Sequence, residues 1–156
     1  MMALILDLIQ SALWAAIPAI GFAMIFNVPA STLVFCGMGG GLTYVFREIL
    51  LLNGLTIELS TFIASTAIGI VGVYWSRKYI MPRPVYTVAS IIPMIPGTYA
   101  YNMMISLMSM NSQGVSQPLL FQFIENGLHA IAILGAIAFG LALPSLYYTK
   151  LKRPVI

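Results

Sequence analysis

Long apolar stretches, separated by short polar or turn-forming segments, make up nearly all of this chain. Each stretch reaches or approaches the roughly 20 residues that an α-helix needs to cross a hydrocarbon core. None shows the two-residue alternation of a membrane β-strand. The expected membrane helices span residues 4–26, 31–51, 59–75, 85–110 and 119–148. The pattern therefore predicts an all-α polytopic membrane protein with five transmembrane helices, forming a single transmembrane domain over residues 1–156.

The amino-acid composition agrees with this interpretation and excludes a water-soluble domain. The chain has 156 residues, of which 60% are hydrophobic and only 7% are charged. Soluble domains carry about a quarter charged residues, which supply their polar surface. The mean hydropathy of +0.97 is correspondingly high. The lipid bilayer is therefore the expected surrounding of nearly the whole chain.

Basic residues outside the expected helices indicate how the chain crosses the membrane. They lie in two segments, Arg77, Lys78 and Arg83 after the third helix, and Lys150, Lys152 and Arg153 after the fifth. Five crossings put both segments on one side, and cytoplasmic segments are enriched in Lys and Arg. We therefore expect a periplasmic amino terminus and a cytoplasmic carboxyl terminus. The net charge of +3 comes from few basic residues and does not indicate nucleic-acid binding.

The motif PMIPG interrupts the fourth expected helix near its middle. Pro93 and Pro96 each remove a backbone donor and clash with the preceding turn, and Gly97 adds a residue without side-chain constraint. We expect this helix to be broken between Pro93 and Gly97. Backbone groups freed in lipid are costly unless protein or water satisfies them, so such breaks line cavities. A proline kink that only shapes helix packing is the alternative.

The second half of the broken helix begins with groups suited to an anionic ligand. Its first amides lack helical partners, and its dipole is positive at the break. Half-helices of this kind bind carboxylates in secondary transporters. Four polar side chains follow directly, Thr98, Tyr99, Tyr101 and Asn102. Together with the Pro93, Pro96 and Gly97 motif they form the predicted substrate path.

Two further residues are candidates for contact with a substrate. Arg47 lies near the end of the second helix, and charges within a membrane usually face a cavity or a partner. Its guanidinium is suited to bind a carboxylate through two parallel hydrogen bonds. The alternative is an arginine that snorkels to the outer interface and pairs with Glu58. Asn27 precedes Pro29, where it either caps a turn or hydrogen-bonds between helices.

Glu125 and His129 are four residues apart on the fifth helix and therefore share a face. They are candidates for a proton relay that couples transport to pH. A hydrogen-bonded pair that locks two helices together is equally consistent with the spacing. One histidine and four scattered acids are too few for a metal site or an enzyme active site. We therefore expect no enzymatic activity, no metal and no cofactor.

Three stretches carry a resemblance to a known family. They are AAIPAIGFAMIFNVP (15–29), STFIAS with the later WSR (60–77), and VYTVASIIPMIPGTYAYNMMIS (85–106). The third is the most specific, because it joins the Pro-X-X-Pro-Gly motif to the following tyrosines. Over essentially its whole length, the chain resembles the small subunit of split threonine/serine exporters. Proteins of this kind include a two-component exporter of succinate and related dicarboxylates.

The resemblance implies a partner, a location and a substrate. A larger membrane subunit of the same exporter family would supply the other half, and both halves would be needed for export across the bacterial inner membrane. The implied function is a secondary transporter subunit that exports succinate and related dicarboxylates, which are small carboxylates. Threonine/serine export, or a structural role with the substrate path in the partner, is the alternative. The motif residues carried over are Pro93, Pro96, Gly97 and Tyr99, with Asn27, Pro29 and Arg47, whereas Glu125 and His129 lie outside the family's pattern.

Overall fold

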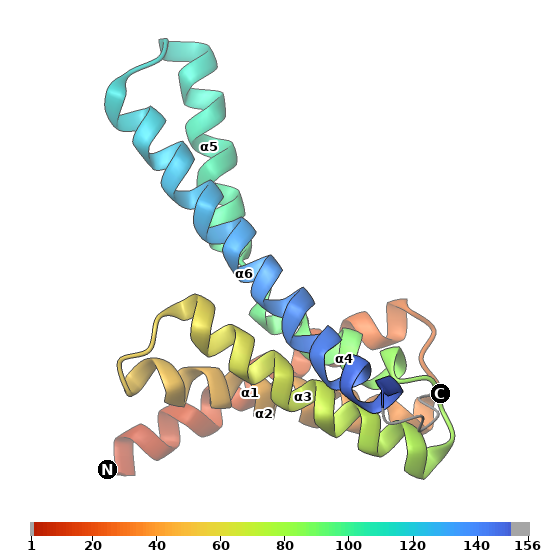
Figure 1. Ribbon diagram of the computed structural model, residues 1–156. Helices are drawn as coiled ribbons and strands as arrows, with labels where there is room; N and C mark the ends of the chain where they lie inside the picture. Colours follow the sequence, from red (N-terminus) through yellow and green to blue (C-terminus); the bar gives the residue numbers. More distant parts are fainter. Residues whose placement is uncertain (1, 151–156) are drawn as a thin grey trace. The chain divides into compact units, whose positions relative to one another are not determined.

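The computed structural model describes residues 2–150, and helices are the only regular secondary structure within that range (Figure 1). The elements are α1 (Met2–Ile25), α2 (Ala30–Leu52), α3 (Ile57–Tyr79), α4 (Pro84–Ile91), the short 3-10 helix η1 (Ile92–Met94), α5 (Gly97–Gln113) and α6 (Gln117–Lys150). The all-α prediction is therefore confirmed. The expected basic residues Lys152 and Arg153 lie outside the described residues.

Four of the described helices, α1, α2, α3 and α6, are long and apolar enough to cross a membrane. They cover the expected spans at 4–26, 31–51, 59–75 and 119–148 to within a few residues. The expected span at 85–110 is divided into α4, η1 and α5, with the interruption at Pro93 to Gly97. The polytopic membrane architecture with a broken fourth span is therefore confirmed.

The chain divides into two compact units. Unit 1 holds the residues up to Met94 together with those from Ala136 onward, and unit 2 is Ile95–Gly135. The break between η1 and α5 thus coincides with the boundary between the units. The single transmembrane domain expected from the sequence stays a prediction.

Small residues on α2 allow the helices of unit 1 to pack closely. The helix α2 contacts α1, α3, α4 and η1. A Cβ atom on Gly41 would lie 2.8 Å from the carbonyl oxygen of Ala12, and one on Gly40 would lie 2.5 Å from the Ala19 side chain. Neither position therefore has room for a side chain. The glycine run of α2 brings the backbones of α1 and α2 together, as small residues do in membrane proteins.

The second half of α6 packs against α3 in the same unit. A Cβ atom on Gly140 would lie 2.8 Å from the carbonyl oxygen of Phe62 and 2.7 Å from the Ser65 side chain. Gly69 of α3 faces the ring of Pro144, whose Cγ would be 3.0 Å from an added Cβ. Glycines on both helices therefore set this close approach.

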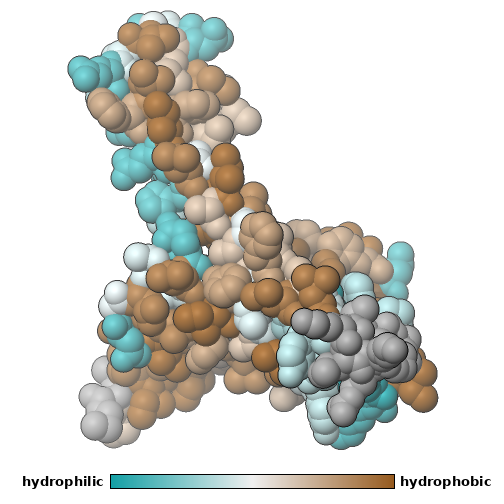
Figure 2. All heavy atoms as spheres, viewed as in Figure 1, coloured by the Kyte–Doolittle hydropathy of each residue, from teal (hydrophilic) through white to brown (hydrophobic). Residues whose placement is uncertain are grey.

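Unit 2 is a helical hairpin formed by α5 and the first half of α6 (Figure 1). The turn between them contains Gly114, whose φ of +88° favours glycine. Met103 of α5 packs over Gly127 of α6, where an added Cβ would lie 3.4 Å from the Met103 sulfur. On this hairpin, hydrophilic side chains gather along one side, whereas apolar ones cover most of the remaining visible surface (Figure 2).

Candidate functional site

The break in the fourth span is a single tight turn at Pro96. Its φ of −77° and ψ of 58° are those of an inverse γ-turn, and the Gly97 N–H donates to the Ile95 carbonyl at 2.8 Å. The helix α5 then starts with a bond of 3.0 Å from the Ala100 N–H to the Pro96 carbonyl. No described side chain caps this amino terminus. The turn thus uses the Gly97 amide, and the positive end of α5 is left to the amides that follow it.

On the other side of the break, Arg47 satisfies a carbonyl that the interruption releases. In a continuous helix the Met94 carbonyl would accept a bond from the N–H of the residue four positions later, Thr98. Instead, the Arg47 guanidinium donates to the Met94 carbonyl through Nη1 at 3.2 Å. Both residues belong to unit 1, so this bond ties α2 to the end of η1.

Arg47 is buried, and its positive charge is not neutralised by any acid among the described residues. Only 8% of its surface is exposed. Its guanidinium lies 4.7 Å from the centre of the Tyr44 ring, which is a cation–π contact. The Nε atom is buried without a hydrogen-bond partner in the described part of the chain. This burial differs from the expected snorkelling alternative, in which the side chain would reach the interface and pair with Glu58.

A cavity of about 280 Å³ opens beside this arginine, between α1, α2 and η1. Its lining residues are Ser11, Trp14, Ala15, Pro18, Tyr44 and Pro93. Tyr44 connects the two features, because its ring both lines the cavity and contacts the Arg47 guanidinium. Ligand pockets for drug-sized molecules are commonly about 300–1,000 Å³, so this cavity suits a smaller metabolite.

A larger groove of about 420 Å³ lies on α1 and α2 but offers almost no polar group. It is lined by Ala12, Leu13, Ala16, Ile20, Val34, Gly37, Met38, Gly41 and Leu42. An apolar groove on a membrane helix pair is solvated by lipid and needs no polar ligand. The smaller cavity is therefore the better candidate for substrate contact, because it combines an aromatic wall with a neighbouring charge.

Unit 2 carries a polar cavity of its own, of about 320 Å³. It is lined by Asn102, Ile105, Ser106, Gln122 and Asn126. The Ser106 hydroxyl donates to the Asn102 carbonyl at 2.9 Å, and the Asn126 amide donates to the Gln122 carbonyl at 2.7 Å. These local bonds leave amide oxygens and N–H groups for a neutral polar ligand or water. The predicted site residue Asn102 is therefore part of a cavity.

The other predicted residues of α5 differ in their surroundings. Thr98 is exposed, and Tyr101 is 66% exposed. Gly97 has no atom within 4 Å of the position that a Cβ would take. Tyr99 contacts His129 of α6, with ring centres 5.0 Å apart. Glu125 is exposed on the same helix.

Asn27 has a backbone role at the end of α1. Its φ is +54°, a left-handed conformation that asparagine tolerates better than most residues. The Asn27 N–H donates to Met24 and the Val28 N–H to Ala23, both at 3.0 Å. These two bonds are the Schellman arrangement that closes a helix. The place of Asn27 in the substrate path stays a prediction.

The comparison with known families decides the identity. Residues 11–147 match the family described as Threonine/Serine exporter, ThrE. This chain belongs to the threonine/serine exporter family. Membership places it among membrane exporters, in agreement with its apolar helices. No solved structure matches this exporter chain.

Several cavity residues of this exporter-family chain were not predicted from its sequence. They are Ser11, Trp14, Tyr44, Gln122 and Asn126. Tyr44 lies three residues before Arg47, so the helical repeat alone places the two on one face. Gln122 and Asn126 are likewise one turn apart on α6. Ser11 and Trp14 carry no comparable signal, because only the packing of α1 onto α2 brings them to the cavity.

Among residues 2–150, no group of three or more His, Cys, Asp or Glu side chains lies close enough to hold a metal ion.

Proposed function

We propose that this chain is the small subunit of a two-component exporter in the bacterial inner membrane, which carries succinate and related dicarboxylates. A larger membrane subunit of the same family is its partner. The family match supports an exporter, and the resemblance described above suggests the split form and the dicarboxylate substrate. The amino terminus is periplasmic and the carboxyl terminus cytoplasmic in this proposal.

The observation that carries the proposal is the buried charge of Arg47 at the break. An uncompensated charge in a membrane protein is expensive and is kept where it serves a pathway or a partner. Arg47 holds the Met94 carbonyl with one nitrogen, and its Nε remains without a partner among the described residues. A carboxylate arriving there would neutralise the charge and supply the missing acceptor.

In this mechanism the carboxylate and the Met94 carbonyl compete for one guanidinium. A carboxylate is the stronger acceptor, because it carries a negative charge and can accept two parallel hydrogen bonds from the guanidinium. Substrate binding therefore releases the carbonyl at the end of η1, directly before the break. Only the segment around Pro93 and Pro96 has to move, and these two prolines already prevent it from forming a regular helix. Release of the substrate restores the bond of Arg47 to Met94.

The amino terminus of α5 is a second feature that attracts a carboxylate by itself. Its dipole is positive, and no described side chain caps it. In the proposal, Thr98, Tyr99, Tyr101 and Asn102 line the substrate path beyond this terminus.

Threonine or serine is the second candidate substrate, and the family's own description favours it. These amino acids also carry a carboxylate for Arg47. Unit 2 has a polar cavity of its own, containing Asn102 and Gln122, whose neutral amides suit the hydroxyl and ammonium groups of an amino acid bound there separately. A third alternative leaves the path in the partner and gives this chain a structural role.

Export from bacteria that lack their own exporters of this family tests the proposal. The chain is expressed with and without the larger partner, and succinate, malate, threonine and serine are measured in the medium. We expect succinate and malate to rise only when both chains are present. Threonine or serine rising instead would keep the exporter and replace the substrate. Export by this chain alone would contradict the two-component architecture.

Gly97→Leu separates a path-forming subunit from a structural one. The open space around Gly97 predicts that the variant chain folds. Gel filtration checks separately that the complex assembles. Loss of export from an assembled complex supports a path at the break. Unchanged export would favour the structural role.

A further inference from the structure

Two arginines, Arg77 and Arg83, lie at the end of unit 1 where α3 ends and α4 begins, which we call the basic end. Both make specific contacts with α6. Arg77 lies in the last turn of α3, and Arg83 immediately precedes α4. The Arg83 guanidinium donates to the Leu141 carbonyl of α6 at 3.2 Å. The Arg77 guanidinium lies 4.6 Å from the centre of the Tyr148 ring. Leu141 and Tyr148 are seven residues apart and so share one face of α6, about 10 Å apart along its axis.

A structured turn holds the two arginines in place. Ile80 ends α3 in a left-handed conformation, with φ of 53°, which is unfavourable for a β-branched residue. The Ser76 hydroxyl donates to the Met81 carbonyl at 2.6 Å, and the Met81 N–H donates back to the Ser76 carbonyl at 3.2 Å. This reciprocal pair stabilises the turn. The spacing between Arg77 and Arg83 is therefore set by the backbone.

The charge of this end is not balanced within the described part of unit 1. The acid of α3 is Glu58, in its first turn, whereas Arg77 and Lys78 lie in its last turn. Nineteen residues separate Glu58 from Arg77, which is about 28 Å along a helix and close to the thickness of a hydrocarbon core. The arginines therefore lie at a membrane interface with their acidic counterpart at the other one. Hydrophilic side chains gather at this end of α3 (Figures 1 and 2).

Arg77 also has unused hydrogen-bonding capacity. Its Nε and one terminal nitrogen are buried and have no hydrogen-bond partner among the described residues. Burial lowers the pKa of Arg83, which lies outside the membrane-spanning helices. Both observations show positive groups that lack the hydration or the acceptors that arginine normally has. An anion would supply what is missing.

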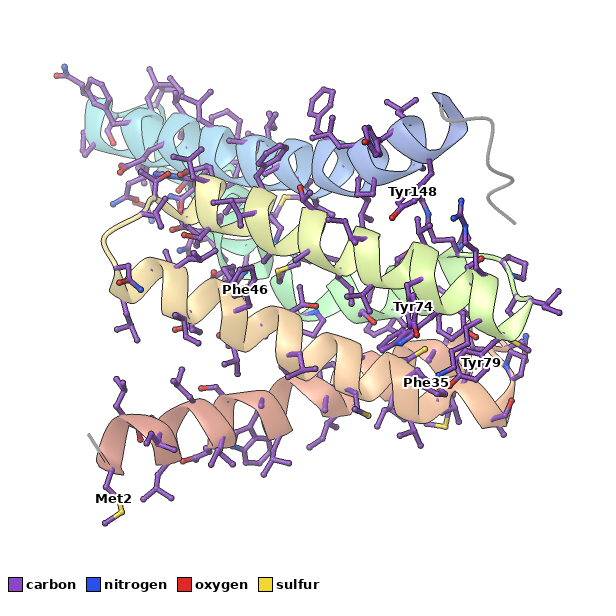
Figure 3. The ribbon with its side chains drawn as sticks, turned by 60° about the horizontal axis from the view of Figure 1, so that its bottom comes forward. Met2, Phe35, Phe46, Tyr74, Tyr79 and Tyr148 are labelled. Carbon is purple, nitrogen blue, oxygen red and sulfur yellow. The ribbon has the colours of Figure 1, made fainter. Side chains whose placement is uncertain are left out.

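Aromatic side chains surround the same end, as they do at membrane interfaces. Phe35 and Tyr79 lie side by side there with ring centres 5.1 Å apart (Figure 3). Trp75 lies 5.2 Å from Phe35 and 5.7 Å from Tyr86 by the same measure. Figure 3 places Tyr148 toward this end of unit 1 as well. The Tyr79 ring is 42% exposed and suits headgroup depth, whereas the Tyr86 ring is buried inside unit 1.

We propose that Arg77 and Arg83, with Lys78 beside them, bind the phosphate of an anionic phospholipid headgroup. Basic pockets between membrane helices are known to hold such headgroups. The phosphate accepts hydrogen bonds from the free N–H groups of Arg77, and the acyl chains follow the apolar sides of α3 and α6. This site is separate from the Arg47 site, so it is independent of the substrate proposal.

Thermal unfolding of the purified full-length chain tests this site. It is titrated with phosphatidylglycerol, with phosphatidylethanolamine and with inorganic phosphate. We expect phosphatidylglycerol to raise the Tm with increasing concentration, because a ligand of the folded state stabilises it. Phosphatidylethanolamine and inorganic phosphate should leave the Tm unchanged. An equal shift by phosphatidylethanolamine would overturn the headgroup site, and an equal shift by inorganic phosphate would replace the lipid with the free ion.

Substitutions of two neighbouring residues distinguish a specific headgroup site from general electrostatic attraction between basic side chains and anionic lipid. Arg77→Gln should weaken the apparent affinity for phosphatidylglycerol about thirtyfold, the loss of a charged hydrogen bond. Lys78→Gln removes the same charge from an exposed neighbour, and its loss should not exceed the roughly fivefold effect of one surface charge. Equal losses in the two variants would overturn the site. If Arg77→Gln does not fold, Arg77→Lys and the three wild-type titrations decide the question.

Discussion

Arg47 of α2 donates a hydrogen bond to the carbonyl of Met94 at 3.2 Å, although 47 residues separate the two in the chain. Met94 is the last residue of η1 and the last residue of unit 1 before the break in the fourth span, so the bond fixes the chain directly before that break. It joins a costly buried charge to a backbone group that the prolines have released. The proposed exporter mechanism rests on this relationship.

Replacing Arg47 with methionine should separate stability from export. The change loses the bond to Met94, worth about 2 kcal/mol because its donor is charged, but it also removes a buried charge that has no described acidic partner. We expect a free energy of unfolding within about 1 kcal/mol of wild type and export reduced at least tenfold. Thermal unfolding and the export assay measure the two quantities. A variant destabilised by several kcal/mol would show that the arginine acts chiefly on the fold.

Pro96→Ala should impair export without destabilising the protein. Alanine restores an N–H that can reach the Ile92 carbonyl, and it removes the ring that favours the inverse γ-turn. We expect unchanged or higher thermal stability and clearly reduced export. Pro118→Ala, at an exposed position in the first turn of α6, is the matched control and should leave both unchanged. Wild-type export by Pro96→Ala would remove the break from the mechanism.

Gly41→Ala should destabilise unit 1, whereas Gly21→Ala should not. The new methyl group at position 41 would lie 2.8 Å from the Ala12 carbonyl oxygen, which belongs to the backbone and cannot rotate away. Such overpacking costs about 1–3 kcal/mol. Gly21 has open space around it and gains helix propensity of about 1 kcal/mol as alanine. Similar melting temperatures for the two variants would contradict the close approach of α1 and α2.

A substitution that keeps an aromatic ring at position 129 tests whether His129 couples export to proton movement. His129→Phe preserves an aromatic contact with Tyr99 but cannot carry a proton. If Glu125 and His129 relay protons, His129→Phe and Glu125→Gln both abolish the dependence of export on an imposed pH gradient. If the ring only packs helices, His129→Phe exports like wild type and His129→Ala does not. We expect the first result, measured in vesicles with a controlled gradient.

Much of the helical plan follows from the apolar pattern alone. The turn at Asn53 and Gly54 and the polar segment around Gly114 interrupt apolar runs, and the helices end close to them. The break at Pro93 to Gly97 was also predictable, because two missing donors and a glycine exclude a regular helix whatever surrounds them. The third helix runs to Tyr79 rather than to residue 75, since its basic last turn remains helical until Ile80 turns left-handed.

The apolar pattern did not predict which side of each helix packs against its neighbours. In a membrane protein both the lipid side and the packed side of a helix are apolar, so periodicity does not show which residues meet. Arg47 near a helix end is compatible with an interfacial position, and its burial follows from contacts with the Met94 carbonyl and the Tyr44 ring. For the same reason, the cavity beside Tyr44 and Pro93 required the packing of three separate elements.

Counterflow of labelled succinate into liposomes that contain the assembled two-chain complex tests the proposed role of Arg47 most directly. Wild type, Arg47→Lys and Arg47→Gln are compared after assembly has been checked by gel filtration. We expect Arg47→Gln to lower counterflow about tenfold or more, and Arg47→Lys to retain part of it at a higher half-saturating concentration. Counterflow by the Arg47→Gln complex with the rate and half-saturation of wild type would contradict the role of this arginine as the carboxylate site.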